Sequence, residues 1–335
     1  MKVFVTGGGG FFGSHLVETL LRDGNQVTAM LRYSSRPNLG NLEHLLKEYS
    51  ESKLKLVFGD IRDTYWLNNA VSDHEAVVHL AALISIPESY SAPLSYLEVN
   101  AQGTLNVLES GRINKVNRIL ITSTSEVYGT AQTEKISESH PLNPQSPYAA
   151  SKVAADSLAL AYSKSFNTPV TILRPFNLFG PRQSSRAVIP TIIQQLLSDT
   201  EFLKLGDIST SREFNFVTDT AEAYLKALTS NVVDGKVLNL GNEFELTLKE
   251  VIEILFEITG LTKEIRVDPG KIRPKDSEVL RLRSNSSEAQ KILNWKPNCC
   301  SKETFISSLR STVEWYKSSP TKKSKLWNQV EGTLK

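Results

Sequence analysis

Four residues with reactive side chains stand out by their spacing. Thr124 lies two positions before Glu126, and Tyr148 lies four positions before Lys152. Residues four apart on a helix share a face, so the Tyr148 phenol and the Lys152 ammonium are expected side by side. A free phenol has a pKa of about 10, and an adjacent ammonium lowers that pKa. We therefore predict that Tyr148 accepts the hydroxyl proton of a carbinol that loses hydride, while Thr124 hydrogen-bonds the same hydroxyl.

Glu126 adds a second kind of proton transfer to this set. A carboxylate placed beside a newly formed ketone can remove a proton from the neighbouring carbon. Oxidation followed by deprotonation of carbon is the chemistry of a dehydratase rather than of a simple dehydrogenase. The alternative interpretation of Glu126 is a solvated carboxylate at a strand end. We favour the catalytic interpretation because Glu126 lies beside Thr124.

A glycine-rich loop at 6–13 supplies the hydride acceptor in this scheme. It follows a strand-like run and opens a helical pattern, and its glycines have the spacing GxxGxxG. In a dinucleotide-binding loop the first glycine turns the chain, the second admits a pyrophosphate, and the third allows close packing of helix and strand. A flexible glycine turn is the alternative, but the position between strand and helix favours a nicotinamide dinucleotide. The predicted cofactor contacts in this loop are Gly7, Gly10, Phe11, Phe12 and Gly13.

The residues after the second strand bear on the choice of cofactor. Proteins that bind NAD place an acidic residue about 20 positions past the loop, where it holds a ribose hydroxyl. Here Arg32, Ser35 and Arg36 stand instead, and such residues suit a 2′-phosphate. We predict NADP, with NAD as the other possibility and a solvated basic loop as the alternative interpretation. Asp60 and Ile61, which end the third strand, are expected to contact the adenine.

Short β-branched runs alternate with amphipathic helical patterns through the first half of the chain. This alternation predicts an α/β fold of the Rossmann type, a doubly wound parallel sheet, with a smaller α+β C-terminal substrate domain. We place the NAD(P)-binding domain at 1–180, with 212–243 returning to it, the substrate domain at 181–211 and 244–318, and a polar tail at 319–335. The predicted strands are 2–6, 26–31, 54–58, 76–79, 118–122, 170–174 and 236–240, and the clearest helices are 14–22, 96–114, 148–166 and 217–230.

Composition excludes several classes of protein. The 335 residues are 40% hydrophobic and 22% charged with a net charge of +2, which gives no case for binding nucleic acid or a membrane. No apolar run approaches the roughly 20 residues of a spanning helix, and a strand begins at once, where a signal peptide would not fit. Cys299 and Cys300 are adjacent, so we expect free thiols, no metal site and a cytoplasmic protein.

Taken together, these segments resemble one family. The chain is similar to extended short-chain dehydrogenases/reductases and, within them, to nucleotide-sugar 4,6-dehydratases, from Met1 to Lys317. That resemblance implies oxidation at C4 of a sugar, proton removal at C5 by Glu126, loss of water from C6 and return of the hydride, giving a 4-keto-6-deoxy product. The matching segments are TGGGGFFG, HLAA (79–82), STSEVYG (123–129), SPYAASK (146–152), RPFNLFGPRQ (174–183) and RPKDSEV (273–279).

The resemblance also implies binding residues outside the catalytic set. It places the substrate's diphosphate and nucleotide against Asn177, Arg186, Arg212 and Arg273, with Val188 beside the base and Glu278 on a ribose hydroxyl. Guanidinium groups suit this role because they bind phosphate oxygens in a bidentate manner. His79 is expected to be a packed structural residue and Asn100 a brace for its helix. Further expected contacts are Leu80, Ala81 and Ala82 for the cofactor and Ser85, Glu88 and Ser125 for the sugar.

Two sub-families share particular segments with this chain. Residues 32–45 resemble the NADP-binding region of GDP-mannose 4,6-dehydratases. Three other stretches resemble the dehydratases that begin legionaminic acid or bacillosamine synthesis, which act on UDP- or GDP-linked N-acetylglucosamine with retention at C5. These stretches are HLAALISIPESY (79–90), STSEVYGTAQ (123–132) and GPRQSSRAVIPTII (180–193). Ser125 stands where dTDP-glucose dehydratases have Asp, which implies that Glu126 handles both protons of the elimination.

Other functions stay open at this point. A nucleotide-sugar 4-epimerase would share the fold and the Thr–Tyr–Lys set, but such epimerases usually lack the glutamate. A non-catalytic NADP-binding sensor or scaffold would need no carbon base. The resemblance further implies a homodimer that pairs through helices 96–114 and 148–166.

Overall fold

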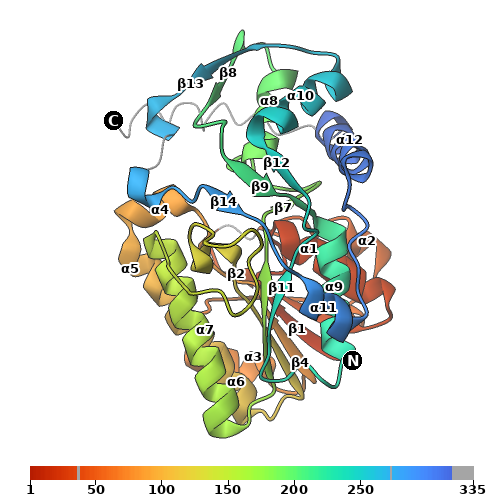
Figure 1. The fold of residues 1–335 in the computed structure, drawn as a ribbon. Helices are drawn as coiled ribbons and strands as arrows, with labels where there is room; N and C mark the ends of the chain where they lie inside the picture. The colour runs from red at the N-terminus through yellow and green to blue at the C-terminus, as the bar shows by residue number, and fades with distance from the viewer. Residues whose placement is uncertain (36–37, 272–273, 319–335) are drawn as a thin grey trace.

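A parallel sheet of seven strands forms the centre of the molecule (Figure 1). The computed structural model describes residues 1–35, 38–271 and 274–318, so Arg36, Arg273 and the tail at 319–335 lie outside the described residues. The strand order β3-β2-β1-β4-β5-β6-β11 is that of a doubly wound sheet, and it confirms the predicted fold class. The strands are β1 (Lys2–Thr6), β2 (Gln26–Arg32), β3 (Leu54–Gly59), β4 (Ala76–His79), β5 (Arg118–Thr122), β6 (Val170–Pro175) and β11 (Val237–Leu240).

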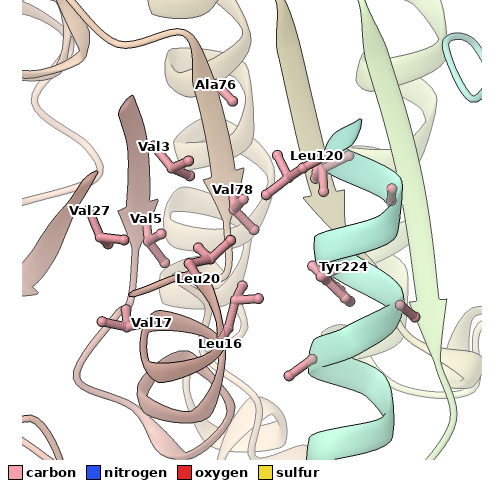
Figure 2. Packing of buried hydrophobic residues seen from close by; sticks show 14 of the residues in the cluster. Val3, Val5, Leu16, Val17, Leu20, Val27, Ala76, Val78, Leu120 and Tyr224 are labelled. Carbon is pink, nitrogen blue, oxygen red and sulfur yellow. The ribbon is translucent and has the colours of Figure 1, made fainter. Parts of the chain in front are cut away.

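Helices cover both faces of this sheet. Successive strand residues point to opposite faces, so Val3 and Val5 lie in one apolar core and Phe4 in the other. On the first face Leu16 of α1 packs towards the sheet, and Tyr224 of α9 lies near Leu120 (Figure 2). The helices of the first face are α1 (Phe11–Arg22) and α9 (Val217–Thr229), and those of the second are α3 (Thr64–Val71), α6 (Gly103–Ile113) and α7 (Pro147–Phe166).

A second region has an apolar core of its own. Helix α10 begins with a capping box between Thr247 and Glu250 and ends at Gly260 in the left-handed conformation. Its buried face packs with α8 and α12 (Figure 1). The elements here are β7 (Leu178–Phe179), α8 (Val188–Leu197), β8 (Phe202–Leu205), β9 (Ser211–Glu213), β10 (Asn215–Phe216), β12 (Glu245–Thr247), α10 (Leu248–Thr259), β13 (Glu264–Val267), β14 (Arg281–Leu282) and α12 (Lys302–Ser318).

The two cores are interleaved along the chain. Helix α11 (Ser287–Leu293) and the following Trp295 pack into the first core, although they come after most of the second region. The domain boundaries given above stay a prediction. The remaining short elements are α2 (Leu45–Glu48), α4 (Ile86–Ser91), α5 (Pro93–Tyr96) and the 3₁₀ turns Ser125–Tyr128, Pro269–Lys271 and Lys275–Ser277.

The helix predicted at 96–114 is helical from residue 96 to residue 113, but it is not α-helical throughout. Leu97–Gln102 forms a stretch of π-helix between α5 and α6. Within it Asn100 is fully buried, and its side chain exchanges hydrogen bonds with the backbone of Leu83 and donates to Ser151 Oγ. A widened turn lets this side chain reach both partners, which a hydrophobic pattern does not reveal.

The described part of the chain contains no helix that combines the length and apolar content needed to cross a bilayer. The same residues hold no cluster of three or more His, Cys, Asp or Glu side chains fit to bind a metal ion. Cys299 is a buried free thiol and Cys300 an exposed one.

Candidate active site

Lys152 is anchored beneath the carboxyl end of β5. Its ammonium donates a hydrogen bond to the carbonyl oxygen of Thr122 at 2.6 Å, and the residue is only 3% exposed. Burial lowers the pKa of Lys152 to about 8, and the carboxylate of Asp156 opposes that shift. The lysine is therefore held in one place with a charge that can be lost close to neutral pH.

Tyr148 lies one turn before Lys152 on the same helix. Helix α7 begins with Pro147, and the Ser146 hydroxyl caps it by accepting from the backbone N–H of Ala149 at 3.1 Å. The phenol is buried and hydrogen-bonds Thr124. Burial raises the pKa of Tyr148 above its usual value, and the Thr124 hydrogen bond opposes this shift. In the protein alone the phenol therefore stays protonated at neutral pH.

Thr124 and Glu126 meet this pair from a 3₁₀ turn that follows β5. The Thr124 hydroxyl caps the turn by accepting from the backbone N–H of Glu126 at 3.2 Å. Glu126 is half-buried and close enough to Tyr148 to help raise the pKa of its phenol. Ser125 between them is buried. The structure thus brings together all four residues of the predicted catalytic set; we call residues 122–126 and 148–156 the catalytic floor.

The glycine loop lies against the end of β4. Gly7 has φ +70°, and a β-carbon there would lie 2.9 Å from the backbone nitrogen of Ala81. A β-carbon on Gly13 would lie 2.2 Å from the carbonyl oxygen of Gly7. Both positions require glycine, and the bare backbone at the start of α1 fits the approach of a dinucleotide pyrophosphate. Phe11, Phe12, Leu80 and Ala82 line the same region, each partly buried.

Thr6 and His79 fix the loop that carries Leu80 and Ala81. The Thr6 hydroxyl accepts from both backbone N–H groups at 3.1 Å, so it donates its own proton to Nδ1 of His79 at 2.8 Å. Nε2 of His79 then donates to Thr104, 3.1 Å away. Burial lowers the pKa of His79 to about 3, which keeps the ring neutral. The histidine is a packed structural residue, as predicted.

The expected ribose and adenine residues lie at the ends of β2 and β3. Arg32 and Ser35 are exposed, as a partner of an incoming phosphate would be. Asp60 forms a bidentate pair with Arg62, with Nη2 to Oδ2 at 2.7 Å and Nε to Oδ1 at 3.0 Å. The hydrogen bond from Arg62 holds the pKa of Asp60 below its usual value. Ile61 is buried.

Within the segment 32–45, Gly40 and Asn41 cover the glycine loop, a contact that the sequence did not predict. The backbone N–H of Asn41 donates to the carbonyl oxygen of Gly9 at 3.0 Å. Gly40 has φ +60°, and a β-carbon there would lie 2.2 Å from the same oxygen. The residues after Arg32 therefore fold back onto the loop. A glycine followed by Asn is the only local signal for this contact.

The predicted substrate residues are arranged as two ion pairs and an unused donor. Arg186 Nη1 lies 2.8 Å from Glu88, and Arg212 Nη2 lies 3.1 Å from Glu278. The side-chain nitrogen of Asn177 is buried and has no hydrogen-bond partner among the described residues. A buried amide donor without a partner suits a ligand oxygen. We call Ser85, Glu88, Arg186, Arg212 and Glu278 the substrate rim.

Ser85 and Val188, two of the predicted substrate contacts, lie at the starts of helices. The hydroxyl of Ser85 caps α4 by accepting from the backbone N–H of Glu88 at 3.4 Å. The carbonyl of Ser85 accepts from the Tyr96 hydroxyl at 2.5 Å. Val188 begins α8 and packs on the core of the second region. The structure therefore ties these residues to packed elements, while Arg273 lies outside the described residues.

Comparison with known proteins identifies the family to which most of the chain is similar. Residues 4–307 match the family described as GDP-mannose 4,6 dehydratase. A dTDP-glucose 4,6-dehydratase of Actinoplanes sp. is 32% identical over 321 residues, which cover 95% of this chain and 98% of that protein.

Solved structures give the same picture. The dTDP-glucose 4,6-dehydratase of Streptomyces venezuelae, determined with NAD bound, is 32% identical with a TM-score of 0.86 and covers 95% of this chain and 97% of that one. The UDP-N-acetylglucosamine 4-epimerase of Methanobrevibacter ruminantium is 30% identical with a TM-score of 0.84, covering 95% and 98%. Dehydratases and epimerases are thus about equally similar to this chain.

Proposed function

We propose that this protein is a 4,6-dehydratase. The chain belongs to the nucleotide-sugar 4,6-dehydratase and 4-epimerase family of extended short-chain dehydrogenases/reductases. The observation that carries this proposal is the position of Glu126 beside the buried Tyr148, within the catalytic floor. An epimerase needs the Thr–Tyr–Lys set but has no step that uses a carbon base.

The first step depends on three residues of the floor. A nicotinamide dinucleotide held at the glycine loop would supply the acceptor, and later the donor, of the hydride. Tyr148 takes the proton of the sugar 4-hydroxyl, which Thr124 orients by a hydrogen bond. Lys152, fixed on the carbonyl of Thr122, places a positive charge below the phenol and favours the phenolate. The positive charge of the oxidised ring acts in the same direction, against the burial that keeps Tyr148 protonated.

Glu126 carries the elimination. The new 4-ketone acidifies the proton on C5, and the Glu126 carboxylate removes it. The same residue, now protonated, gives a proton to the C6 hydroxyl, which leaves as water. Ser125 is too weak an acid to take this second part. Return of the hydride to C6 and of a proton to C5 completes a 4-keto-6-deoxy sugar, with the cofactor as it began.

The substrate rim supplies recognition of the nucleoside diphosphate. Arg186 and Arg212 exchange their carboxylate partners for phosphate oxygens, and the unused amide of Asn177 donates to the substrate. We favour UDP- or GDP-linked N-acetylglucosamine as the substrate, because three segments resemble the dehydratases that act on it. The resemblance implies an Asp in dTDP-glucose dehydratases where this chain has Ser125, which supports a different substrate.

For the cofactor we favour NADP. Support comes from Arg32, which ends β2 exposed where an acidic residue would bind the ribose of NAD. NAD, which the Streptomyces venezuelae enzyme holds, is the alternative. We expect the purified protein to carry NADP and Arg32→Asp to shift its preference towards NAD. Extraction of NAD alone from the wild-type protein would contradict the role given to Arg32.

A homodimer is the assembly that we favour. Helices α6 and α7 pack side by side on one face of the sheet, and Leu97 beside them is 51% exposed (Figure 1). Pairing of this face about a two-fold axis would brace the helix that carries Tyr148 and Lys152. Light scattering at micromolar concentration should give the mass of a dimer, and the mass of one chain would refute this assembly.

A substrate panel tests the proposed activity. The protein is incubated with UDP-, GDP-, CDP- and dTDP-linked hexoses, and each mixture is analysed by mass spectrometry. A dehydratase converts at least one substrate to a product lighter by one water. Conversion to an isomer of unchanged mass would establish the epimerase instead, and cofactor binding without any conversion would favour a sensor or scaffold.

A further inference from the structure

Asp156 lies one helical turn beyond Lys152 and is 1% exposed. One of its carboxylate oxygens, Oδ2, accepts two hydrogen bonds, from Ser123 Oγ at 2.8 Å and from Arg174 Nε at 3.0 Å, and lies 2.9 Å from Arg174 Nη2 in the same ion pair. The other oxygen, Oδ1, is buried and has no hydrogen-bond partner among the described residues. A buried carboxylate with one unused oxygen is costly, so its retention calls for a function.

Arg174 connects this carboxylate to the edge strand β11. Its guanidinium is buried and donates through Nη1 to the Tyr128 hydroxyl at 2.7 Å. The guanidinium carbon, Cζ, lies 4.9 Å from the centre of the Tyr128 ring. The Tyr128 hydroxyl in turn donates to Asn239 on β11 at 2.7 Å. The chain of contacts runs from β11 through β6 to α7. It fixes Asp156, and therefore the turn that bears Lys152, relative to the sheet.

The charged and titratable groups around Lys152 belong to four packed elements. On α7 itself Asp156 favours the charged lysine, against the burial that lowers its pKa to about 8. His79 on β4 is neutral, Arg174 on β6 is positive, and Glu126 and Tyr128 belong to the turn after β5. Tyr148 is a neutral phenol in the protein alone.

We propose that Asp156 is a positioning residue: its buried carboxylate, paired with Arg174 and one helical turn from Lys152, keeps the Lys152 ammonium charged and holds helix α7 against the end of β5. Through Lys152 it sets the pH range in which Tyr148 can act as the base. Asp156 touches neither substrate nor cofactor in this account. The inference rests on the roles proposed above for Tyr148 and Lys152.

The position of one carboxylate near two cations predicts shifts of opposite sign. Asp156→Asn removes the anion that favours the Lys152 ammonium, so the pKa of Lys152 should fall further. Arg174→Gln removes the competing cation and leaves the Asp156 charge to Lys152, so the pKa of Lys152 should rise. An opposite charge at this range typically moves a pKa by about 1 unit or more. A purely structural role would lower activity in both variants without moving the pKa in opposite directions.

The test measures Lys152 directly and then through turnover. Protein labelled with ¹³C at the lysine ε-carbon is titrated by NMR without cofactor or substrate, and Lys152→Met identifies the signal. The pH dependence of hydride transfer is then followed in a single turnover. We expect Asp156→Asn to move both the NMR midpoint and the alkaline loss of rate about 1 unit lower. Arg174→Gln should move both higher. Ser157→Ala, an exposed position on the same helix whose hydroxyl donates to the carbonyl oxygen of Val153, should leave both in place.

Each result decides the proposal. If Asp156→Asn does not fold, the double variant Asp156→Asn/Arg174→Gln removes both buried charges together and should show the same lower midpoint. Unchanged midpoints, or shifts of the same sign in Asp156→Asn and Arg174→Gln, would overturn it. The NMR titration needs no turnover, so opposite NMR shifts in a protein that never releases water would uphold the role of Asp156 and refute the dehydratase.

Discussion

The catalytic floor and the substrate rim hold their charges in different ways. In the floor, Lys152 and Asp156 are almost fully buried, and each is bound to neighbouring strands by hydrogen bonds. In the rim, Arg186 and Glu88 pair at 2.8 Å with their side chains 60% and 54% exposed. Arg212 and Glu278 form a second, less exposed pair.

This difference in burial separates the residues proposed for catalysis from those proposed for substrate binding. An exposed ion pair such as Arg186–Glu88 contributes about 0–1 kcal/mol, so a diphosphate can replace the Glu88 carboxylate at little cost. Removal of one partner from a buried pair costs about 3–5 kcal/mol, so the floor is expected to stay as built during turnover. Substitutions in the floor should therefore act on kcat, and substitutions in the rim should act on KM.

The largest effect is expected from Tyr148→Phe. Loss of the phenolic proton acceptor should lower kcat by about 10²–10⁴-fold, because proton transfer by a positioned side chain typically contributes a rate factor of that size. Binding of the nucleotide sugar should survive, since the phenol acts on charge that develops in the transition state. Steady-state kinetics and calorimetric binding measure the two separately. Tyr162→Phe on the same helix, whose hydroxyl only bonds Glu109, is the matched control. Activity within a few-fold of wild type would remove Tyr148 from the mechanism.

Arg212→Ala should have the next largest effect and the opposite kinetic signature. Loss of a charge-assisted hydrogen bond to phosphate, worth about 1.5–3 kcal/mol, should raise KM about 10–100-fold. The value of kcat should change little, because the diphosphate does not react. Initial rates over a range of substrate concentrations provide the test. A fall in kcat at unchanged KM would mean that the rim does more than bind.

Glu88→Gln should have the smallest effect and would sharpen the comparison. The change releases Arg186 from an exposed partner, so KM should fall, by no more than about 5-fold. The gain should shrink as salt is added, because exposed pairs are screened. A Kd for nucleoside diphosphate measured at low and high salt tests both points. A weaker affinity for the nucleoside diphosphate, which lacks the sugar that Glu88 is expected to contact, would show that Glu88 does not compete with phosphate for Arg186.

The sequence predicted the nucleotide-binding half closely, for physical reasons. Most strands of the parallel sheet are short apolar runs that are largely buried, so the limits of all seven were found to within a single residue. The residues of the predicted catalytic set follow from spacing, since Tyr148 and Lys152 share a helix face and Thr124 lies two residues after the buried strand β5. These signals are local, and the fold only has to bring two segments together.

Contacts between distant segments left no such signal. The π-helical stretch around Asn100 depends on partners at Leu83 and Ser151. The pairing of Arg174 with Asp156 joins a strand to a helix, and neither residue stands out by type. The rim arginines could be recognised only through the family resemblance, and their carboxylate partners depend on how the second region folds against the first.

Glu126→Gln tests the central claim most directly. The amide keeps the shape and most hydrogen bonds of the side chain but cannot remove the proton from C5. With substrate in a single turnover, hydride should still leave C4 through Thr124, Tyr148 and Lys152, while elimination stalls. We predict that the near-ultraviolet absorbance of reduced nicotinamide rises and persists with little product, and that wild-type product made in heavy water carries deuterium at C5. Dehydration at the wild-type rate by the variant, or no deuterium at C5, would contradict the account.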